Sequence, residues 1–197
     1  MDKITVIQRT VKTSVFGFVI HFLGYGSILL LPALMREDNQ RNGLGLEECD
    51  NAVNGTQFLI LAAVHGGANL LGRVVGAVLH NRVRFKVSQP IFAACMTVCY
   101  GVLLTSPSIP VTSLSLGISK FLYAAMVLEK TLMSYDPVYI GTAYLVESSA
   151  VAVASAQFGG AIGVALAVFL TPYNAVVIAF FLSCMQIAVT CCIRDRD

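Results

Sequence analysis

Long apolar stretches set the strongest constraint on what this chain can fold into. About six of them, each close to twenty residues long, follow one another with short polar connections between them. A membrane-spanning helix needs about 20 apolar residues, and backbone N–H and C=O groups in lipid must bond within helices or a closed barrel. The stretches are continuous and do not alternate in twos, so they predict helices.

The composition of the chain favours the same class. Hydrophobic residues make up 56% of the 197 residues and charged residues 12%, whereas a soluble domain carries about 25% charged residues. Mean hydropathy is +0.76. A formal net charge of +2 is too small to indicate nucleic-acid binding, which requires many phosphate contacts. We therefore expect an all-α, polytopic helix bundle embedded in the lipid bilayer.

Polar or proline-containing connections divide the chain into six predicted spans. The clearest break is at Pro137, because proline lacks a backbone donor and restricts the residue before it. We expect one domain over residues 1–197. Its predicted transmembrane helices cover about residues 13–35, 57–80, 87–105, 111–133, 141–170 and 175–193.

The distribution of Lys and Arg predicts the orientation of these spans. With the N-terminus inside, only Arg36 and Arg41 lie outside. The basic residues on the inner side are then Lys3, Arg9, Lys12, Arg82, Arg84, Lys86, Arg194 and Arg196. Both termini are therefore predicted to be cytoplasmic, in a multi-pass protein of the plasma membrane or a vesicle membrane.

The outer loop contains a glycosylation pattern. Asn54, Gly55 and Thr56 form an N-x-Thr acceptor on the side predicted to be outside. We predict a glycoprotein modified at Asn54. The alternative is that the nearby span 57–80 hides the acceptor from the transferase.

Polar side chains inside the predicted spans are the candidates for function. A charged group at the bilayer centre costs at least about 2.5–3.5 kcal/mol, so such residues normally face the bundle interior or a water-filled cavity. The predicted substrate-binding residues are His21, Tyr25, His65, Asn69, Lys120, Glu147 and Gln157.

Lys120 is the most informative of these residues. It lies roughly eight residues into its span, or about 12 Å deep at 1.5 Å per residue. It is predicted to face a substrate path or to pair with a buried acid, for which Glu147 is the natural candidate. Alternatively, its long stem reaches back to the outer interface. Glu129 and Lys130, near the inner end of the same span, are predicted to form an interfacial pair.

Small residues recur at helical spacing in two spans. Ala68, Gly72 and Gly76 are four residues apart, so they lie on one face of their span and let another helix approach closely. A later span repeats this pattern with Gly159, Gly160 and Gly163. Tight packing is the simpler interpretation of both patterns, and helices that slide or rock against each other are the alternative.

No arrangement of residues typical of an enzyme is present in the sequence. It lacks a Ser/His/Asp set, HExxH, a Walker loop and CxxC. Cys95 and Cys99 share a helix face, but no His or carboxylate lies near them in sequence, so we expect them to pack as small hydrophobic residues. We predict a protein that is not an enzyme and holds no cofactor or metal.

Four short segments, in order, carry a resemblance to a known family. Phe22–Gly26 is similar to an aromatic-glycine opening of a seventh helix, and Asn81–Lys86 to a D-R-x-G-R-K turn between an eighth and a ninth. Ser119–Phe121 looks like the start of a tenth helix, and Asp136–Tyr139 like the P-E-V-Y-P entry to an eleventh. The set resembles the C-terminal six-helix half of a major facilitator superfamily transporter, in its synaptic-vesicle-protein-like and sugar or organic-ion porter branch.

This resemblance implies alternating access with a second six-helix half, or with a second copy as a homodimer. It implies a small organic solute, which Lys120 favours as anionic, and proton coupling through a His or Glu147. Arg82, Arg84 and Lys86 would form a gate turn on the cytoplasmic side. The alternative function is a non-transporting membrane subunit or truncated relative that acts through protein–protein interaction. Asn81 supports this alternative, because it replaces the acid of the family's turn.

Overall fold

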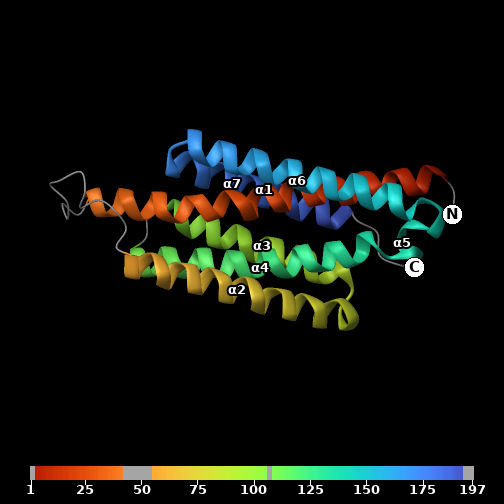
Figure 1. The fold of residues 1–197 in the computed structure, drawn as a ribbon, viewed down its shortest axis with the longest axis horizontal. Coiled ribbons are helices and arrows are strands. Elements are labelled where there is room, and N and C mark those ends of the chain that lie inside the picture. The colour runs from red at the N-terminus through yellow and green to blue at the C-terminus, as the bar shows by residue number, and fades with distance from the viewer. Residues whose placement is uncertain (1–2, 42–54, 106–107, 193–197) are drawn as a thin grey trace.

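The computed structural model describes residues 3–41, 55–105 and 108–192. Within these ranges all the regular elements are helical, and there is no strand. Its elements are α1 (Lys3–Arg41), α2 (Gly55–Arg82), α3 (Phe85–Leu104), α4 (Ile109–Ser134), α5 (Pro137–Ile140), the 3-10 turn η1 (Thr142–Tyr144), α6 (Leu145–Phe169) and α7 (Pro172–Cys192). The long helices run side by side along one axis (Figure 1).

Five helices in the described ranges are long and apolar enough to cross a membrane. These segments are Ala62–Arg82, Phe85–Leu104, Pro110–Ser134, Thr142–Phe169 and Pro172–Cys191. The prediction of an all-helical, integral multi-pass membrane protein is therefore confirmed. The remaining predicted span, residues 13–35, lies within α1, and its crossing of the membrane stays a prediction.

The predicted break at Pro137 is confirmed and is longer than expected. Asp136 caps the short helix α5, its Oδ1 accepting the Val138 N–H at 2.9 Å. Gly141 then has a φ of 92°, a conformation that L side chains rarely adopt. The following long helix, α6, consequently begins at Leu145, four residues later than the predicted start at residue 141.

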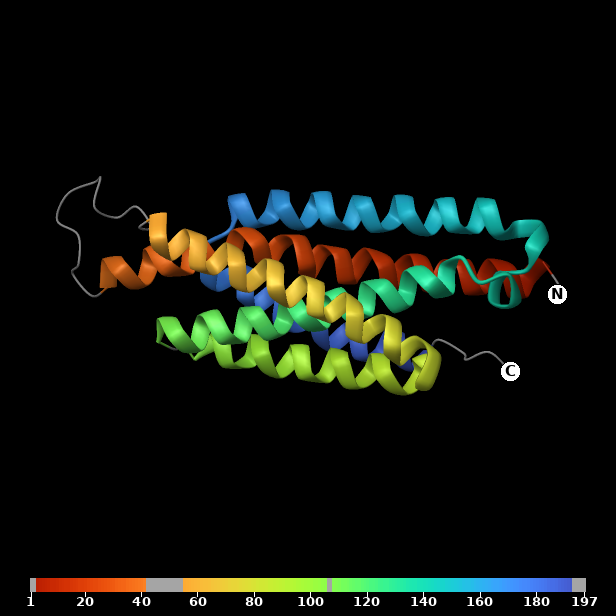
Figure 2. The same cartoon turned by 60° about the horizontal axis from the view of Figure 1, so that its bottom comes forward.

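The helix ends nearest the two termini and two of the connections gather at one end of the bundle. The first turn of α1, the last turn of α7, the α2–α3 turn and the α4–α5 connection all lie there (Figures 1 and 2). This arrangement is expected when long helices run back and forth along one axis, because short connections then lie at the two ends of the bundle. It places Lys3 and Arg9 at the same end as Arg82 and Arg84. That this end is cytoplasmic stays a prediction.

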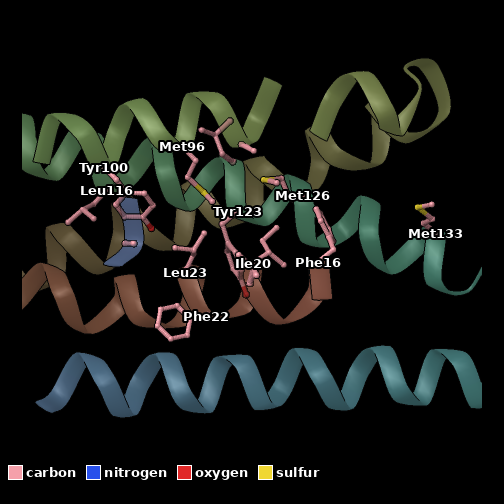
Figure 3. Packing of buried hydrophobic residues seen from close by; sticks show 14 of the residues in the cluster. Phe16, Ile20, Phe22, Leu23, Met96, Tyr100, Leu116, Tyr123, Met126 and Met133 are labelled. Carbon is pink, nitrogen blue, oxygen red and sulfur yellow. The ribbon is translucent and has the colours of Figure 1, made fainter. Parts of the chain in front are cut away.

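The apolar core lies between α1, α3, α4 and α7. Phe16 and Ile20 of α1 are fully buried, as are Met96 of α3 and Met126 of α4. Figure 3 shows these side chains pointing toward one another. In lipid such packing is favoured by close van der Waals contact rather than by removal of apolar surface from water.

The predicted small-residue faces allow two helix pairs to approach at backbone distance. A Cβ added at Gly163 of α6 would lie 2.5 Å from the Phe22 carbonyl oxygen of α1. One added at Gly76 of α2 would lie 2.7 Å from the Ala125 carbonyl oxygen of α4. The close packing predicted from sequence is thus confirmed, and the structure identifies the partners as α1 with α6 and α2 with α4.

A polar contact ties the break after α4 back to α1. The Arg9 Nη1 of α1 donates to the Tyr139 carbonyl oxygen of α5 at 2.5 Å. The Arg9 guanidinium also lies 4.8 Å from the centre of the Tyr139 ring, a distance suited to a cation–π interaction. This contact holds the short helix α5 against the start of the bundle.

Gly76→Ala should destabilise the protein although alanine is the better helix former. Overpacking typically costs about 1–3 kcal/mol, against a helix-propensity gain of about 1 kcal/mol. Gly66→Ala on the same helix is the matched control, because nothing lies within 4 Å of its added Cβ. Thermal unfolding in detergent should give a lower midpoint for Gly76→Ala than for Gly66→Ala. Equal midpoints would contradict the close approach of α2 and α4.

Arg9→Lys should lower stability while keeping the charge. The ammonium cannot reproduce the planar guanidinium over the Tyr139 ring, a loss of about 1 kcal/mol. For a chain of this length this corresponds to a fall in Tm of about 2–4 °C. The control is Arg82→Lys, which changes an exposed arginine and should leave Tm unchanged. Equal shifts in both variants would mean that the Tyr139 contact contributes nothing.

Candidate functional site

Lys120 lies near the middle of α4 with its ammonium inside the bundle. The side chain is 7% exposed, and its Nζ donates to the Gly24 carbonyl oxygen of α1 at 3.3 Å. The Nζ also lies 4.5 Å from the centre of the Tyr123 ring. Across the described ranges, the structure records no carboxylate paired with this lysine. Lys120 therefore does not reach the outer interface, and its charge is offset only by a carbonyl dipole and a ring face.

Aromatic side chains surround this lysine. The His21 ring stacks on Tyr25 of the same helix at a centroid distance of 6.0 Å, as their i,i+4 spacing allows. His21 also meets the Tyr123 ring edge to face at 6.0 Å. The ring nitrogen Nδ1 of His21 lies 3.0 Å from the Gly17 carbonyl oxygen. Three predicted site residues, His21, Tyr25 and Lys120, are thus brought together.

Arg73 of α2 adds a second permanent charge to the same place. It is exposed and lies within electrostatic reach of Lys120 and Tyr123. We call His21, Tyr25, Arg73, Lys120 and Tyr123 the basic cluster. Tyr25 and Arg73 lie at its accessible rim, whereas Lys120 and Tyr123 lie beneath them. A group of cations without a bonded acid creates a positive potential that attracts anions.

His65 and Asn69 continue from this cluster along α2. Both are half-buried, and they precede Arg73 by two turns and one turn on the same helix face. The Asn69 Oδ1 is buried, and it accepts no hydrogen bond from the residues that the structure describes. These two predicted residues therefore share a helix face with the basic cluster.

Glu147 and Gln157 are not brought to the basic cluster. Glu147 is exposed at the start of α6 and lines a groove of about 220 Å³ between α1 and α6. The Thr10 Oγ1 of α1 donates to the Oγ of the neighbouring Ser148 at 2.9 Å. Thr10 lies about 21 Å along α1 from Gly24, at 1.5 Å per residue, and Gly24 is the residue whose carbonyl oxygen Lys120 contacts. The pairing of Lys120 with Glu147 considered from sequence is therefore not formed. Gln157 is exposed on α6.

The predicted gate turn borders a basic cavity at the end of the bundle. The cavity has a volume of about 260 Å³, and it is lined by His80, Asn81, Arg82, Val83, Arg84, Phe85, Met133 and Asp136. Arg82 and Arg84 are exposed, as is Lys86 in the first turn of α3. The predicted acceptor Asn54 lies outside the described residues.

The predicted interfacial pair of Glu129 and Lys130 is wrong. Both side chains are buried, at 1% and 3% exposure, and they point to different helices because consecutive residues do not share a helix face. Lys130 Nζ donates to the Ala152 carbonyl oxygen of α6 at 3.2 Å. Glu129 instead accepts hydrogen bonds from Ser88 and Gln89 of α3.

Metal binding finds no support in the part of the chain that the structure describes. No three His, Cys, Asp or Glu side chains come together there in a way that could hold an ion. Cys95 is exposed and Cys99 is buried, although one helical turn separates them.

Sequence comparison finds no matching protein-family model and no matching curated protein. Structural comparison finds similarity to the human organic anion transporter MFSD10 (TETRAN), with a TM-score of 0.68 and 17% sequence identity. The match covers 96% of this chain and 48% of that one, so the chain spans about half the length of that transporter. The bundle thus has a fold similar to that of about half of this transporter.

Proposed function

We propose that this chain is one half of a membrane transporter that binds a small organic anion at the basic cluster. The observation that carries this proposal is Lys120, a buried lysine at the middle of α4 whose Nζ bonds a single carbonyl oxygen. A charge in that position is costly unless it is compensated. A bound carboxylate or sulfonate would supply the missing negative charge.

The surroundings of Lys120 suit an anion that carries an apolar body. Tyr25 is 37% exposed at the rim of the basic cluster, and Arg73 is also exposed; both lie within electrostatic reach of Tyr123. An acidic group could therefore reach Lys120 between these two side chains, while the tyrosine rings contact the rest of the solute. The similarity of the fold to a transporter described as an organic anion transporter agrees with this chemistry.

Alternating access would need a second six-helix bundle. The chain covers 48% of the length of its structural relative, and the candidate span of α2 is only 11% buried within this chain. A separate N-terminal half or a second copy would cover that surface and close the other side of the binding site. We infer that α1, α2, α4 and α6 line the shared cavity.

The second candidate function is a non-transporting membrane subunit. Asn81 favours it, because this neutral residue stands in the basic turn where related transporters have an acid. Such a subunit would keep the exposed α2 surface for a partner protein and would not move a solute.

Lys120→Ala should weaken anion binding about tenfold or more. A hydrogen bond to a charged group contributes about 1.5–3 kcal/mol, and 1.4 kcal/mol corresponds to a factor of ten. Binding and uptake of 6-carboxyfluorescein would be measured in proteoliposomes containing the full chain, with cationic rhodamine 6G as the probe of opposite charge. Lys120→Arg should retain part of the affinity because it keeps the charge.

The matched control is Lys3→Ala, which removes an exposed lysine from the start of α1. It should change neither the binding nor the uptake of either probe. Equal loss in the Lys3 and Lys120 variants would show only a surface-charge effect and would sink the proposed site. Binding of carboxyfluorescein without uptake by the dimer would exclude a transporter built from two copies of this chain, and would leave either a separate second half or the non-transporting subunit.

A further inference from the structure

A buried polar group lies between α3 and α4, on the side of α4 away from Lys130. It consists of Ser88, Gln89 and Glu129, whose side chains are 4%, 0% and 1% exposed. The Ser88 Oγ donates to the Glu129 Oε2 at 2.8 Å, and the Gln89 Nε2 donates to the same oxygen. Both donors are neutral, and among the residues that the structure describes no cation is paired with this carboxylate.

Two oxygen atoms of this group have no donor. The Glu129 Oε1 and the Gln89 Oε1 are buried, and neither accepts a hydrogen bond from any residue that the structure describes. A buried acceptor without a partner costs about 1–3 kcal/mol, and more when it is charged. With Glu129 ionised, the group thus carries two unsatisfied acceptors and one uncompensated charge.

A single proton removes all three costs. A protonated carboxyl is one O–H donor and one carbonyl acceptor, and the Gln89 amide offers the complementary acceptor and donor. With the proton on Oε1, Glu129 can donate to the Gln89 Oε1 while its Oε2 still accepts from the Gln89 Nε2. The two side chains then form a cyclic acid–amide pair with two hydrogen bonds.

We propose that Glu129, held by Gln89 and Ser88, is a proton-binding site of this membrane protein. The proton occupies Oε1 and completes the pair with Gln89. Sodium is the less suitable ion, because two of the three side chains already direct donors at the carboxylate, and a hard cation needs several oxygen ligands.

The basic cavity at the α2–α3 turn lies one helical turn away from this site on both α3 and α4. Phe85 and Met133 line that cavity. Phe85 precedes Gln89 by one turn on α3, and Met133 follows Glu129 by one turn on α4, so each shares a face with its partner. Along the helix axes, these two lining residues are therefore about 6 Å from Gln89 and Glu129.

Charged groups on the surrounding helices are separated from this carboxyl. Lys130 follows it on α4 but points to α6, and Asp136 lies at the cavity before α5. The other charged or histidine side chains that the structure describes at this end of the bundle are Lys3, Arg9 and Lys12 on α1, His80 and Arg82 on α2, Arg84 and Lys86 at the start of α3, and Glu147 on α6. The recorded side-chain partners of Glu129 are Ser88 and Gln89.

The site goes beyond the proposed anion binding and does not depend on it. Proton binding at Glu129 is defined by the acid–amide geometry, which involves none of the residues of the basic cluster. If both proposals hold, α4 carries the anion-binding Lys120 and the proton-binding Glu129 on one rigid helix, an arrangement suited to moving an anion together with a proton.

Infrared difference spectroscopy of the full chain in liposomes tests the site directly. A protonated carboxyl shows a C=O stretching band that carboxylates lack. We expect such a band at neutral pH in the wild type, and we expect it to disappear as the pH is raised. Glu129→Gln should abolish the band and keep the fold, because a second amide can form the same cyclic pair with Gln89. The matched control, Glu147→Gln, removes an exposed acid and should leave the band unchanged.

Gln89→Leu provides a second readout if Glu129→Gln does not fold. It removes the acceptor of the proposed O–H bond, so the band should move to higher wavenumber and titrate at a different pH. Absence of a neutral-pH band in the wild type would overturn the proposal. So would a band that is unaffected by both variants, or one that disappears when sodium replaces choline at fixed pH. None of these readouts depends on transport of an anion.

Discussion

Backbone contact between α1 and α6 determines how the rest of the bundle is arranged. Gly163 has no side chain where α6 meets the carbonyl of Phe22, and Ser155 donates to the Ser14 carbonyl oxygen at 2.9 Å further along. With one side of α1 held so closely, its His21 and Gly24 face α4. The contact between Lys120 and the Gly24 carbonyl, and hence the basic cluster, depends on this rotation of α1.

Most polar side chains in the spans need nothing from outside their own helix. Ser119, Thr131 and Ser134 each donate to a carbonyl four residues earlier, a bond that satisfies a hydroxyl without any cross-helix partner. Against this background, Lys120, Glu129 and Lys130 stand out, because local bonding cannot compensate a formal charge. Their positions, rather than the number of polar residues, carry the functional argument.

The existence of the long helices follows from the sequence, because apolar length alone decides it in lipid. The contact between the His21 and Tyr25 rings also follows from the sequence, since residues four apart share a helix face. Which helices would pair did not follow, because apolar helices are similar on all sides. The failure of Glu147 to reach Lys120 could not be foreseen without knowing how far α6 extends beyond the cluster. Arg73 lies within the predicted span 57–80, but nothing in the sequence indicates that it approaches Lys120.

The adjacent positions of Glu129 and Lys130 make α4 sensitive to its register. One residue turns a helix by about 100°, so a single insertion between Lys120 and Glu129 would rotate the acid away from Gln89. It would also move the amine of Lys130 off the Ala152 carbonyl oxygen. Substitutions on the outer surface of α4 carry no such penalty. Over evolutionary time the length of this helix should therefore vary less than the identity of its exposed residues.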